Sequence, residues 1–277
     1  MPKNAHLAEE QFLVAADLDG DRKNSRIRLA ASISQEDITD QLAEHMTVSN
    51  ELVWDRERND LIRHIEWKLD GMRLRTVRQK PEPSEQTTAA LIERIRATSL
   101  QVLTWNDNAI SLRQRVAFLH SRNNEWPDWS NKNLLASLDE WLEPYLAGCT
   151  SRSDLEALNV ALILRSGLPM HLGSELDALA PERVTLNNGA EFTIAYRGDE
   201  LPRITARVQA FYGATIHPCI GAGEVPLVVE LLSPAQRPVQ VTSDLPAFWA
   251  GSWAEVRKEM AGRYPKHSWP ANPNVRE

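Results

Sequence analysis

The spacing of apolar residues changes twice along the chain and divides it into three segments. Up to about residue 80, apolar and polar positions alternate in short runs, which is typical of strands with one buried face. From residue 84, apolar residues recur every three or four positions, which predicts helices. Short β-type runs return after residue 181. The pattern therefore predicts an α+β protein with domains at residues 1–80, 84–180 and 181–277.

Five strands and one short helix are predicted in residues 1–80. The strands are expected at residues 12–16, 26–30, 48–54, 61–69 and 72–79. Ser34 and Asp37 have the spacing of a capping box, which begins the helix. The dipeptide Asp70-Gly71 favours the positive φ angles of a tight type I′ hairpin. Because five short strands and a helix are typical of a small barrel, we expect a partial OB-like β-barrel.

A helical layer of four or five helices is predicted for residues 84–180. One helix is expected to run unbroken from Ser130 to Gly148, where a left-handed glycine would end it. Another is expected to begin at a capping box of Ser153 and Glu156.

Residues 181–277 are predicted to form a C-terminal α+β unit with β-hairpins. Asn188-Gly189 is expected to be the turn of the first hairpin, while residues 204–211 fit either a strand or a helix. Asp244 is expected to cap a short helix. A second helix is expected to begin at a capping box of Ser252 and Glu255, to run to about Ala261 and to end at Gly262. An extended tail rich in proline and aromatic residues completes the unit.

The composition is that of a folded protein with an acidic balance. Charged residues make up 25% of the 277 residues and hydrophobic residues 42%, close to globular averages. The formal net charge is −7, whereas a protein that binds phosphate backbones over its whole surface is normally basic. Any nucleic-acid contact must therefore come from a local patch. No apolar run approaches the roughly 20 residues of a membrane span, so no membrane partner is expected. The two distant cysteines, Cys149 and Cys219, suit a reducing compartment, so a cytoplasmic location is expected.

Two groups of basic and aromatic residues are the candidates for such a patch. The first lies in the hairpin at residues 61–79 and consists of Arg63, Trp67, Lys68, Arg73, Arg75 and Arg78, with His64 beside them. The second lies near the C-terminus and consists of Arg257, Lys258, Arg263, Tyr264, Lys266, His267 and Trp269. Basic side chains can follow a phosphate backbone, and aromatic rings can stack bases. The alternatives are a solvated strand face for the first group and anchors of an extended tail for the second.

Several long runs of the chain carry a family resemblance. They are Leu231–Pro238, Gly262–Pro270, Ala16–Gly20 and residues 112–116, 126–128 and 138–146. Together they resemble the C-terminal region of the HrpB-type ATP-dependent helicases, a branch of the DEAH-box RNA helicases. The resemblance implies an OB-like part and a C-terminal domain that contact single-stranded RNA. It also implies regulation of a helicase motor domain, which would bind ATP and Mg²⁺ outside this chain.

Two interpretations of this resemblance stay open. In the family, the barrel begins before the position of Met1, so its first strands are expected to be missing and a sheet edge left open. This predicts a truncated gene product or an excised piece of a helicase. The alternative is a free-standing protein-interaction module that kept the fold without nucleic-acid binding.

No residues are predicted to be catalytic or to bind a cofactor or metal. The phosphate-binding pattern G-x-x-x-x-G-K-[ST] is absent from the sequence. Residues 139–142, with the sequence Asp-Glu-Trp-Leu, lack the His of a DEAH box and are patterned as an amphipathic helix. His217 and Cys219 have no second pair of ligands at metal-binding spacing. An enzyme assembled from carboxylates distant in sequence stays open as a third interpretation.

Overall fold

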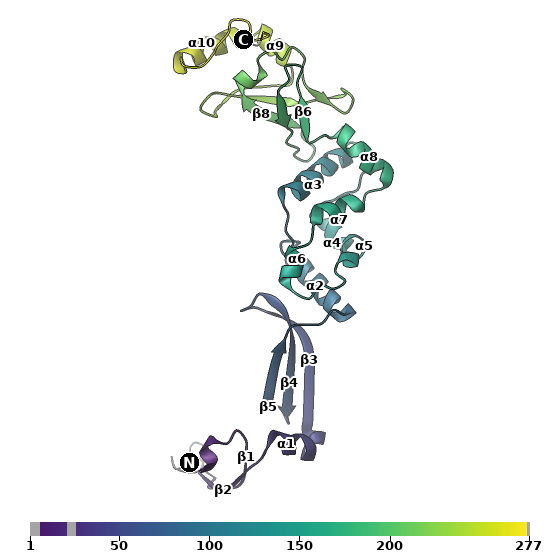
Figure 1. The fold of residues 1–277 in the computed structure, drawn as a ribbon, viewed down its shortest axis with the longest axis vertical. Coiled ribbons are helices and arrows are strands. Elements are labelled where there is room, and N and C mark those ends of the chain that lie inside the picture. The colour runs from purple at the N-terminus through teal and green to yellow at the C-terminus, as the bar shows by residue number, and fades with distance from the viewer. Residues whose placement is uncertain (1–5, 21–25, 276–277) are drawn as a thin grey trace. The chain divides into compact units, whose positions relative to one another are not determined.

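The computed structural model describes residues 6–20 and 26–275, which belong to two compact units, Met1–Ala90 and Leu91–Glu277 (Figure 1). Helix α2 (Glu85–Ala97) crosses the boundary between them. The α+β class predicted from the sequence is confirmed. The division into three domains, with a boundary at residues 180–181, stays a prediction.

The first unit contains all five predicted strands in two antiparallel sheets. Strands β1 (Leu13–Leu18) and β2 (Ile27–Ser32) form one sheet, and β3 (Met46–Asp55), β4 (Asp60–Leu69) and β5 (Met72–Gln79) form the other. The remaining elements are η1 (His6–Glu9), α1 (Gln35–Gln41) and η2 (Ala43–His45). The described residues form no closed barrel, and the OB-like relationship stays a prediction.

Local sequence signals of the first unit act as predicted. Ser34 accepts a hydrogen bond from the backbone N–H of Asp37, whose carboxylate accepts one from Ser34, which confirms the capping box. Asp70 and Gly71 have φ angles of 44° and 85°, as a type I′ turn requires. This turn fixes the register of the β4–β5 hairpin, which carries the first candidate group.

Seven short helices occupy the first half of the second unit. They are α2 and α3 (Asp107–His120), α4 (Asn131–Ala136), α5 (Leu138–Trp141), α6 (Arg152–Glu156), α7 (Val160–Ser166) and α8 (Met170–Leu179), with the 3-10 helix η3 (Glu143–Tyr145) after α5. The unbroken helix predicted from Ser130 is wrong. Ser137 leaves helical geometry, with its hydroxyl on the Asn133 carbonyl, and Pro144 has no N–H to continue the ladder.

Two predicted capping boxes are also wrong. The cap of α6 is Ser151, whose hydroxyl accepts from the N–H of Asp154, so the box lies two residues before the predicted pair. At the start of α10 (Trp253–Arg263), Ser252 makes no side-chain cap hydrogen bond. At α6, two serines and two acidic residues stand within residues 151–156, so neighbouring pairs have the same spacing and the sequence alone does not select the one that begins the helix.

The second half of the second unit is built on a three-stranded sheet in the order β12-β11-β8. Its strands are β8 (Arg203–Arg207), β11 (Val228–Leu232) and β12 (Pro238–Thr242), and β8 pairs with β11 in parallel. Residues 204–211 are a strand followed by the 3-10 helix η4 (Val208–Phe211). Two-stranded ladders join β6 (Arg183–Thr185) to β7 (Glu191–Thr193) and β9 (Cys219–Ile220) to β10 (Val225–Pro226). Helices α9 (Leu245–Ala250) and α10 follow.

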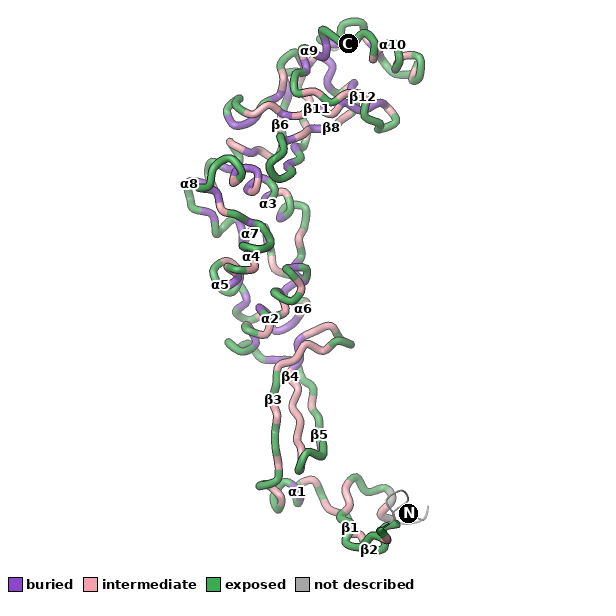
Figure 2. The backbone as a smooth tube through the Cα atoms, turned by 180° about the vertical axis from the view of Figure 1, so that it is seen from behind, coloured by how far each residue is buried: buried purple, intermediate pink, exposed green. Residues whose placement is uncertain are grey.

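Burial is concentrated in the second unit, as the purple segments of Figure 2 show. In the described part of the first unit, the buried hydrophobic side chains are Ile38, Leu61, Ile62 and Leu74. The second unit also buries Arg115 of α3, whose guanidinium donates to the Ala180 carbonyl, Asp177 and Glu182. This arginine joins the helices to the start of the C-terminal sheets. No helix in the described ranges is long and apolar enough to cross a membrane.

Candidate nucleic-acid interface

The first candidate group is divided between the two faces of the β3–β4–β5 sheet. Successive residues of a strand point to opposite faces, so Trp67 and Lys68 of β4 lie on different faces. On β5, Arg75 pairs with Trp67, whereas Arg73 pairs with Lys68. Alternation alone would put Arg73 and Arg75 on one face. A β-bulge at Leu74 separates them, because it inserts one extra residue into β5.

One face, which we call the cationic face, carries His64, Lys68, Arg73 and Arg78. His64 pairs across the ladder with Arg78, and Lys68 with Arg73. Lys68 Nζ lies 2.6 Å from Glu66, and Arg73 lies 3.6 Å from the same carboxylate. These residues therefore form one continuous charged surface of the hairpin.

Two carboxylates of the cationic face lie beneath its cations, whereas Glu51 of β3, which pairs with His64, is exposed. The side chains of Glu66 and Asp55 are 13% and 8% exposed, whereas those of Arg73 and Arg78 are 68% and 51% exposed. Arg78 lies 3.7 Å from Asp55. A hydrogen bond from Lys68 lowers the pKa of Glu66, and the backbone N–H of Arg58 lowers that of Asp55, so both stay ionised. The positive ends project outward and can accept a second anion.

A hollow of about 520 Å³ opens on the cationic face. His64, Arg73, Thr76 and Arg78 line it, and none of these lining residues is acidic. Guanidinium groups present planar forks of donors that match phosphate oxygens, and the Thr76 hydroxyl adds a further donor. The hollow is chemically suited to a phosphodiester.

The opposite face carries Arg63, Trp67 and Arg75. The guanidinium carbon of Arg75 lies 5.2 Å from the centre of the Trp67 ring, and Arg63 donates to the side-chain oxygen of Asn50 at 3.2 Å. Arg75 also lines a hollow with Gln35, Glu36, Thr39 and Asp40 of α1. The two acidic residues that line this hollow, Glu36 and Asp40, make this face less favourable for a phosphate than the cationic face.

Three members of the second candidate group, Arg257, Tyr264 and Trp269, hold the C-terminal tail in place. Trp269 is 8% exposed, and its indole N–H donates to the Tyr264 carbonyl at 2.9 Å. Arg257 of α10 donates from Nε to the Trp269 carbonyl at 2.7 Å. The ring centres of Trp253 and Trp269 are 6.2 Å apart, and the indole N–H of Trp253 donates to the Pro270 carbonyl. These contacts favour the interpretation as anchors of an extended tail.

The remaining members of the second group lie at the surface. Lys258, Lys266 and His267 are exposed, and Arg263 lies 3.6 Å from Glu259, one turn earlier on α10. A role of these side chains in nucleic-acid binding stays a prediction.

His217 connects two distant segments of backbone. It lies 2.9 Å from the Leu227 carbonyl through Nε2, and its Nδ1 accepts the N–H of Leu245 at 3.1 Å. Since a carbonyl only accepts and an amide N–H only donates, the imidazole is neutral with its proton on Nε2. Burial lowers its pKa. Within residues 6–20 and 26–275, no three His, Cys, Asp or Glu side chains are placed to hold a metal ion.

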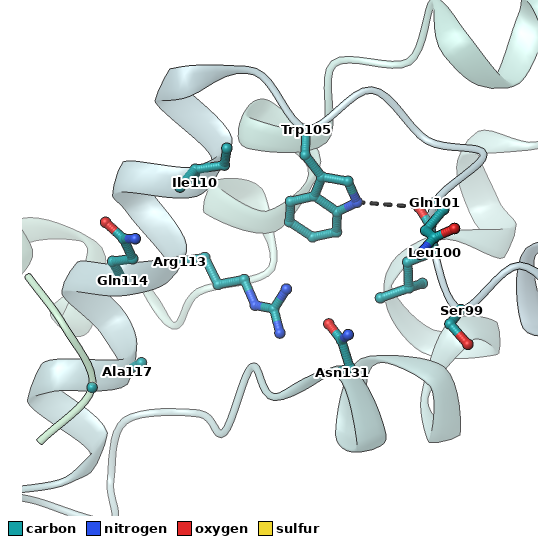
Figure 3. Close-up of a pocket in the computed structure, with 10 residues that line it drawn as sticks. Ser99, Leu100, Gln101, Trp105, Ile110, Arg113, Gln114, Ala117 and Asn131 are labelled. Carbon is teal, nitrogen blue, oxygen red and sulfur yellow. Dashed lines mark hydrogen bonds between the residues drawn. The ribbon is translucent and has the colours of Figure 1, made fainter.

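A pocket of about 450 Å³ in the second unit was missed from the sequence. Trp105, Arg113 and Asn131 line it, together with the turn after α2 (Figure 3). These residues come from three elements and form no motif. The one local signal is Arg113, a charged residue in a helix whose neighbours Leu112 and Val116 are buried.

Comparisons with known proteins agree on one family. Residues 141–273 match the family model of the ATP-dependent helicase C-terminal domain, HrpB_C. The chain is 35% identical to the ATP-dependent RNA helicase HrpB of Escherichia coli (strain K12), over 98% of the chain and 34% of that protein. It spans about a third of the length of this curated relative.

Two crystal structures are similar over nearly the whole chain. The structure of the E. coli DExH-box NTPase HrpB matches with a TM-score of 0.66 and 33% identity, covering 99% of this chain and 34% of that one. The structure of the E. coli DEAH/RHA helicase HrpB matches with a TM-score of 0.59 and 32% identity, covering 95% and 33%.

Proposed function

Because the chain belongs to the HrpB-type ATP-dependent helicases and corresponds to their C-terminal region, we propose that it contacts single-stranded RNA and acts with a helicase motor domain. Its E. coli relative is named an ATP-dependent RNA helicase. In this proposal ATP and Mg²⁺ bind to the motor domain, and the chain described here supplies nucleic-acid contact and regulation of the motor.

The hollow on the cationic face carries the proposal. It is lined by His64, Arg73, Thr76 and Arg78, and the side chains of the two arginines are more than half exposed. The carboxylates that hold these guanidinium groups lie below the surface. A strand of RNA would run across the hollow with its phosphates on Arg73 and Arg78, and Lys68 would extend the path along β4. Such contact is independent of base sequence and sensitive to salt.

Removal of the two guanidinium groups that line the hollow tests the proposal. We expect Arg73→Ala combined with Arg78→Ala to weaken binding of a 12-nucleotide uridine RNA about tenfold in 100 mM salt. The slope of log affinity against log salt concentration should become shallower by about 1.4, because each of the two lost phosphate contacts contributes about 0.7 to it. Fluorescence anisotropy over a salt series measures both.

The matched control is the double variant Arg63→Ala and Arg75→Ala, which removes the same charge from the opposite face of the same hairpin. It should keep the affinity and the salt slope of the unmodified chain. Equal weakening by both pairs would show that net charge, rather than the hollow, attracts RNA. No RNA binding by the unmodified chain, or salt-insensitive binding, would favour the protein-interaction module instead.

A further inference from the structure

A mixed apolar and polar pocket lies against α3, apart from the cationic face. Leu100, Trp105, Ile110 and Ala117 provide apolar surface, and the volume of about 450 Å³ is large enough for a planar aromatic group. Ile110 is 42% exposed, although it lies on a helix whose other apolar residues are mostly buried. The exposed side chain of Ile110 therefore gives the pocket an apolar surface that a ligand could cover.

The polar groups of the pocket are three carboxamides, a hydroxyl and a single guanidinium. They belong to Gln101, Gln114, Asn131, Ser99 and Arg113. None of the residues that line the pocket is acidic. Carboxamides and guanidinium groups are the side chains that recognise the edges of nucleobases, whereas binding of a free phosphate normally gathers several cations.

Arg113 is held in place and keeps donors available to a ligand. Its Nε donates to the Trp129 carbonyl at 2.6 Å, and its guanidinium carbon lies 5.2 Å from the centre of the Trp105 ring. Among the described residues, its two terminal nitrogens have no hydrogen-bond partner. Figure 3 shows the guanidinium directed into the space between Trp105 and Asn131.

The nearby acid, Asp128, attracts this guanidinium electrostatically, but its carboxylate oxygens are occupied by other donors. Asp128 accepts hydrogen bonds from the N–H of Ser130 and from the carboxamide of Asn133, at 2.8 and 2.7 Å. Trp105 is itself fixed, because its indole N–H donates to the Leu100 carbonyl at 3.2 Å. The aromatic ring and the donor fork are therefore preorganised, which reduces the entropy lost on binding.

We propose that this pocket binds an unstacked guanine base of single-stranded RNA. The base would lie against the Trp105 ring, and the free nitrogens of Arg113 would donate to guanine O6 and N7, with Asn131 on a further polar edge. Adenine lacks the O6 acceptor and offers a donor there, so it would bind more weakly. The ligand class rests on the proposed RNA contact, and the pocket adds base preference to a contact that is otherwise independent of sequence.

Binding of RNA that carries a single guanosine tests the inference. Two 12-nucleotide uridine RNAs are compared, one with a central guanosine and one with a central adenosine, by anisotropy with the full chain. We expect the guanosine RNA to bind about tenfold more tightly, a preference within the range of one bidentate base contact. Arg113→Met should remove the preference and leave the affinity for the adenosine RNA nearly unchanged.

Two further variants separate recognition from folding. Asn131→Asp places a carboxylate beside Arg113 at an exposed position in the first turn of α4, where a negative charge suits the helix. It should abolish the preference while the chain stays folded. Arg122→Met is the matched control, because Arg122 lies two residues after the end of α3 and does not line the pocket. Its guanidinium carbon lies 4.7 Å from the centre of the Phe118 ring. This variant should keep the preference.

Guanosine monophosphate alone provides an independent measurement. Its addition should shift the indole N–H resonance of Trp105, assigned with Trp105→Phe, and Arg113→Met should suppress the shift. A preference for the guanosine RNA without a shift of the Trp105 resonance by the mononucleotide would mean that the pocket binds guanine only within an RNA strand. A shift of that resonance without RNA binding would mean that the pocket binds free nucleotides, which would contradict the inference. Equal affinity for both RNAs together with an unmoved Trp105 resonance overturns the inference.

The failure of this inference is distinguishable from that of the proposed function. The Arg73 and Arg78 double variant should weaken binding of both RNAs equally and keep the guanine preference. If the unmodified chain binds both RNAs without preference, the pocket inference fails while the RNA contact stands.

Discussion

At the scale of single residues, His217 shows how a buried polar group is used in the C-terminal unit. Its ring accepts the N–H of Leu245, the first residue of α9, and lies against the Leu227 carbonyl just before β11. Only the neutral imidazole can make both hydrogen bonds, since protonation of Nδ1 removes the acceptor. Burial opposes protonation and is stronger than the effects of Leu227 and Asp244, which raise the pKa.

This arrangement predicts a pH dependence of stability. The pKa of His217 is lower in the folded chain than its ordinary value of about 6.5, so the unfolded chain binds the proton more readily. The contribution of His217 to stability is therefore fully present above pH 6.5 and is lost as the pH falls below it. Urea unfolding at a series of pH values should show this loss. Gln in place of His217 can donate and accept without titrating, and a slope unchanged by His217→Gln would contradict the prediction.

At the scale of elements, glycines show how local geometry decides the sign of a substitution. Gly71 has a φ of 85° in the β4–β5 turn, whereas Gly173 lies inside α8 with an ordinary helical backbone. An added Cβ meets no atom within 4 Å at either position. Backbone conformation alone therefore distinguishes the two sites.

We expect Gly71→Ala to destabilise the chain by about 1 kcal/mol, because an L side chain is strained at positive φ. Gly173→Ala should stabilise it by about 0.5–1 kcal/mol, because alanine is the better helix former. Chemical denaturation of both variants measures the two changes in the free energy of unfolding. Changes of the same sign at the two positions would contradict the conclusion that backbone conformation distinguishes them.

At the scale of the whole molecule, the two units differ in how much apolar surface they bury. In the second unit, Ile204 of β8 and Val229 and Leu231 of β11 are 0% exposed. In the first unit, Val14, Leu18 and Leu29 of the β1–β2 sheet are 50%, 51% and 62% exposed. Stability within a chain follows local burial, so local opening should be easier in β1 and β2.

Hydrogen exchange of the whole chain can measure this difference. The amides of β8 and β11 should exchange only through global opening of their unit, whereas those of β1 and β2 should exchange orders of magnitude faster. Protection of β1 and β2 equal to that of β11 would mean that their exposed apolar side chains are covered in solution.

The sequence by itself determined the features that depend on neighbours a few residues apart. The strands of residues 1–80, the Ser34 cap and the Asp70-Gly71 turn follow from alternation, a capping hydroxyl and positive φ angles, all of which act locally. The resemblance to the HrpB-type helicases was recognised for the same reason, since it lies in runs of neighbouring residues.

Only the tertiary structure decided which of these residues meet. The bulge at Leu74 places Arg73 and Arg75 on opposite faces, and the parallel pairing of β8 with β11 joins strands about twenty residues apart. The pocket at Arg113 combines a turn, two helices and a distant loop. Burial, register and cavities depend on contacts between segments far apart in sequence. A pattern along the chain includes the residues that make such contacts, but it does not show which of them contact each other.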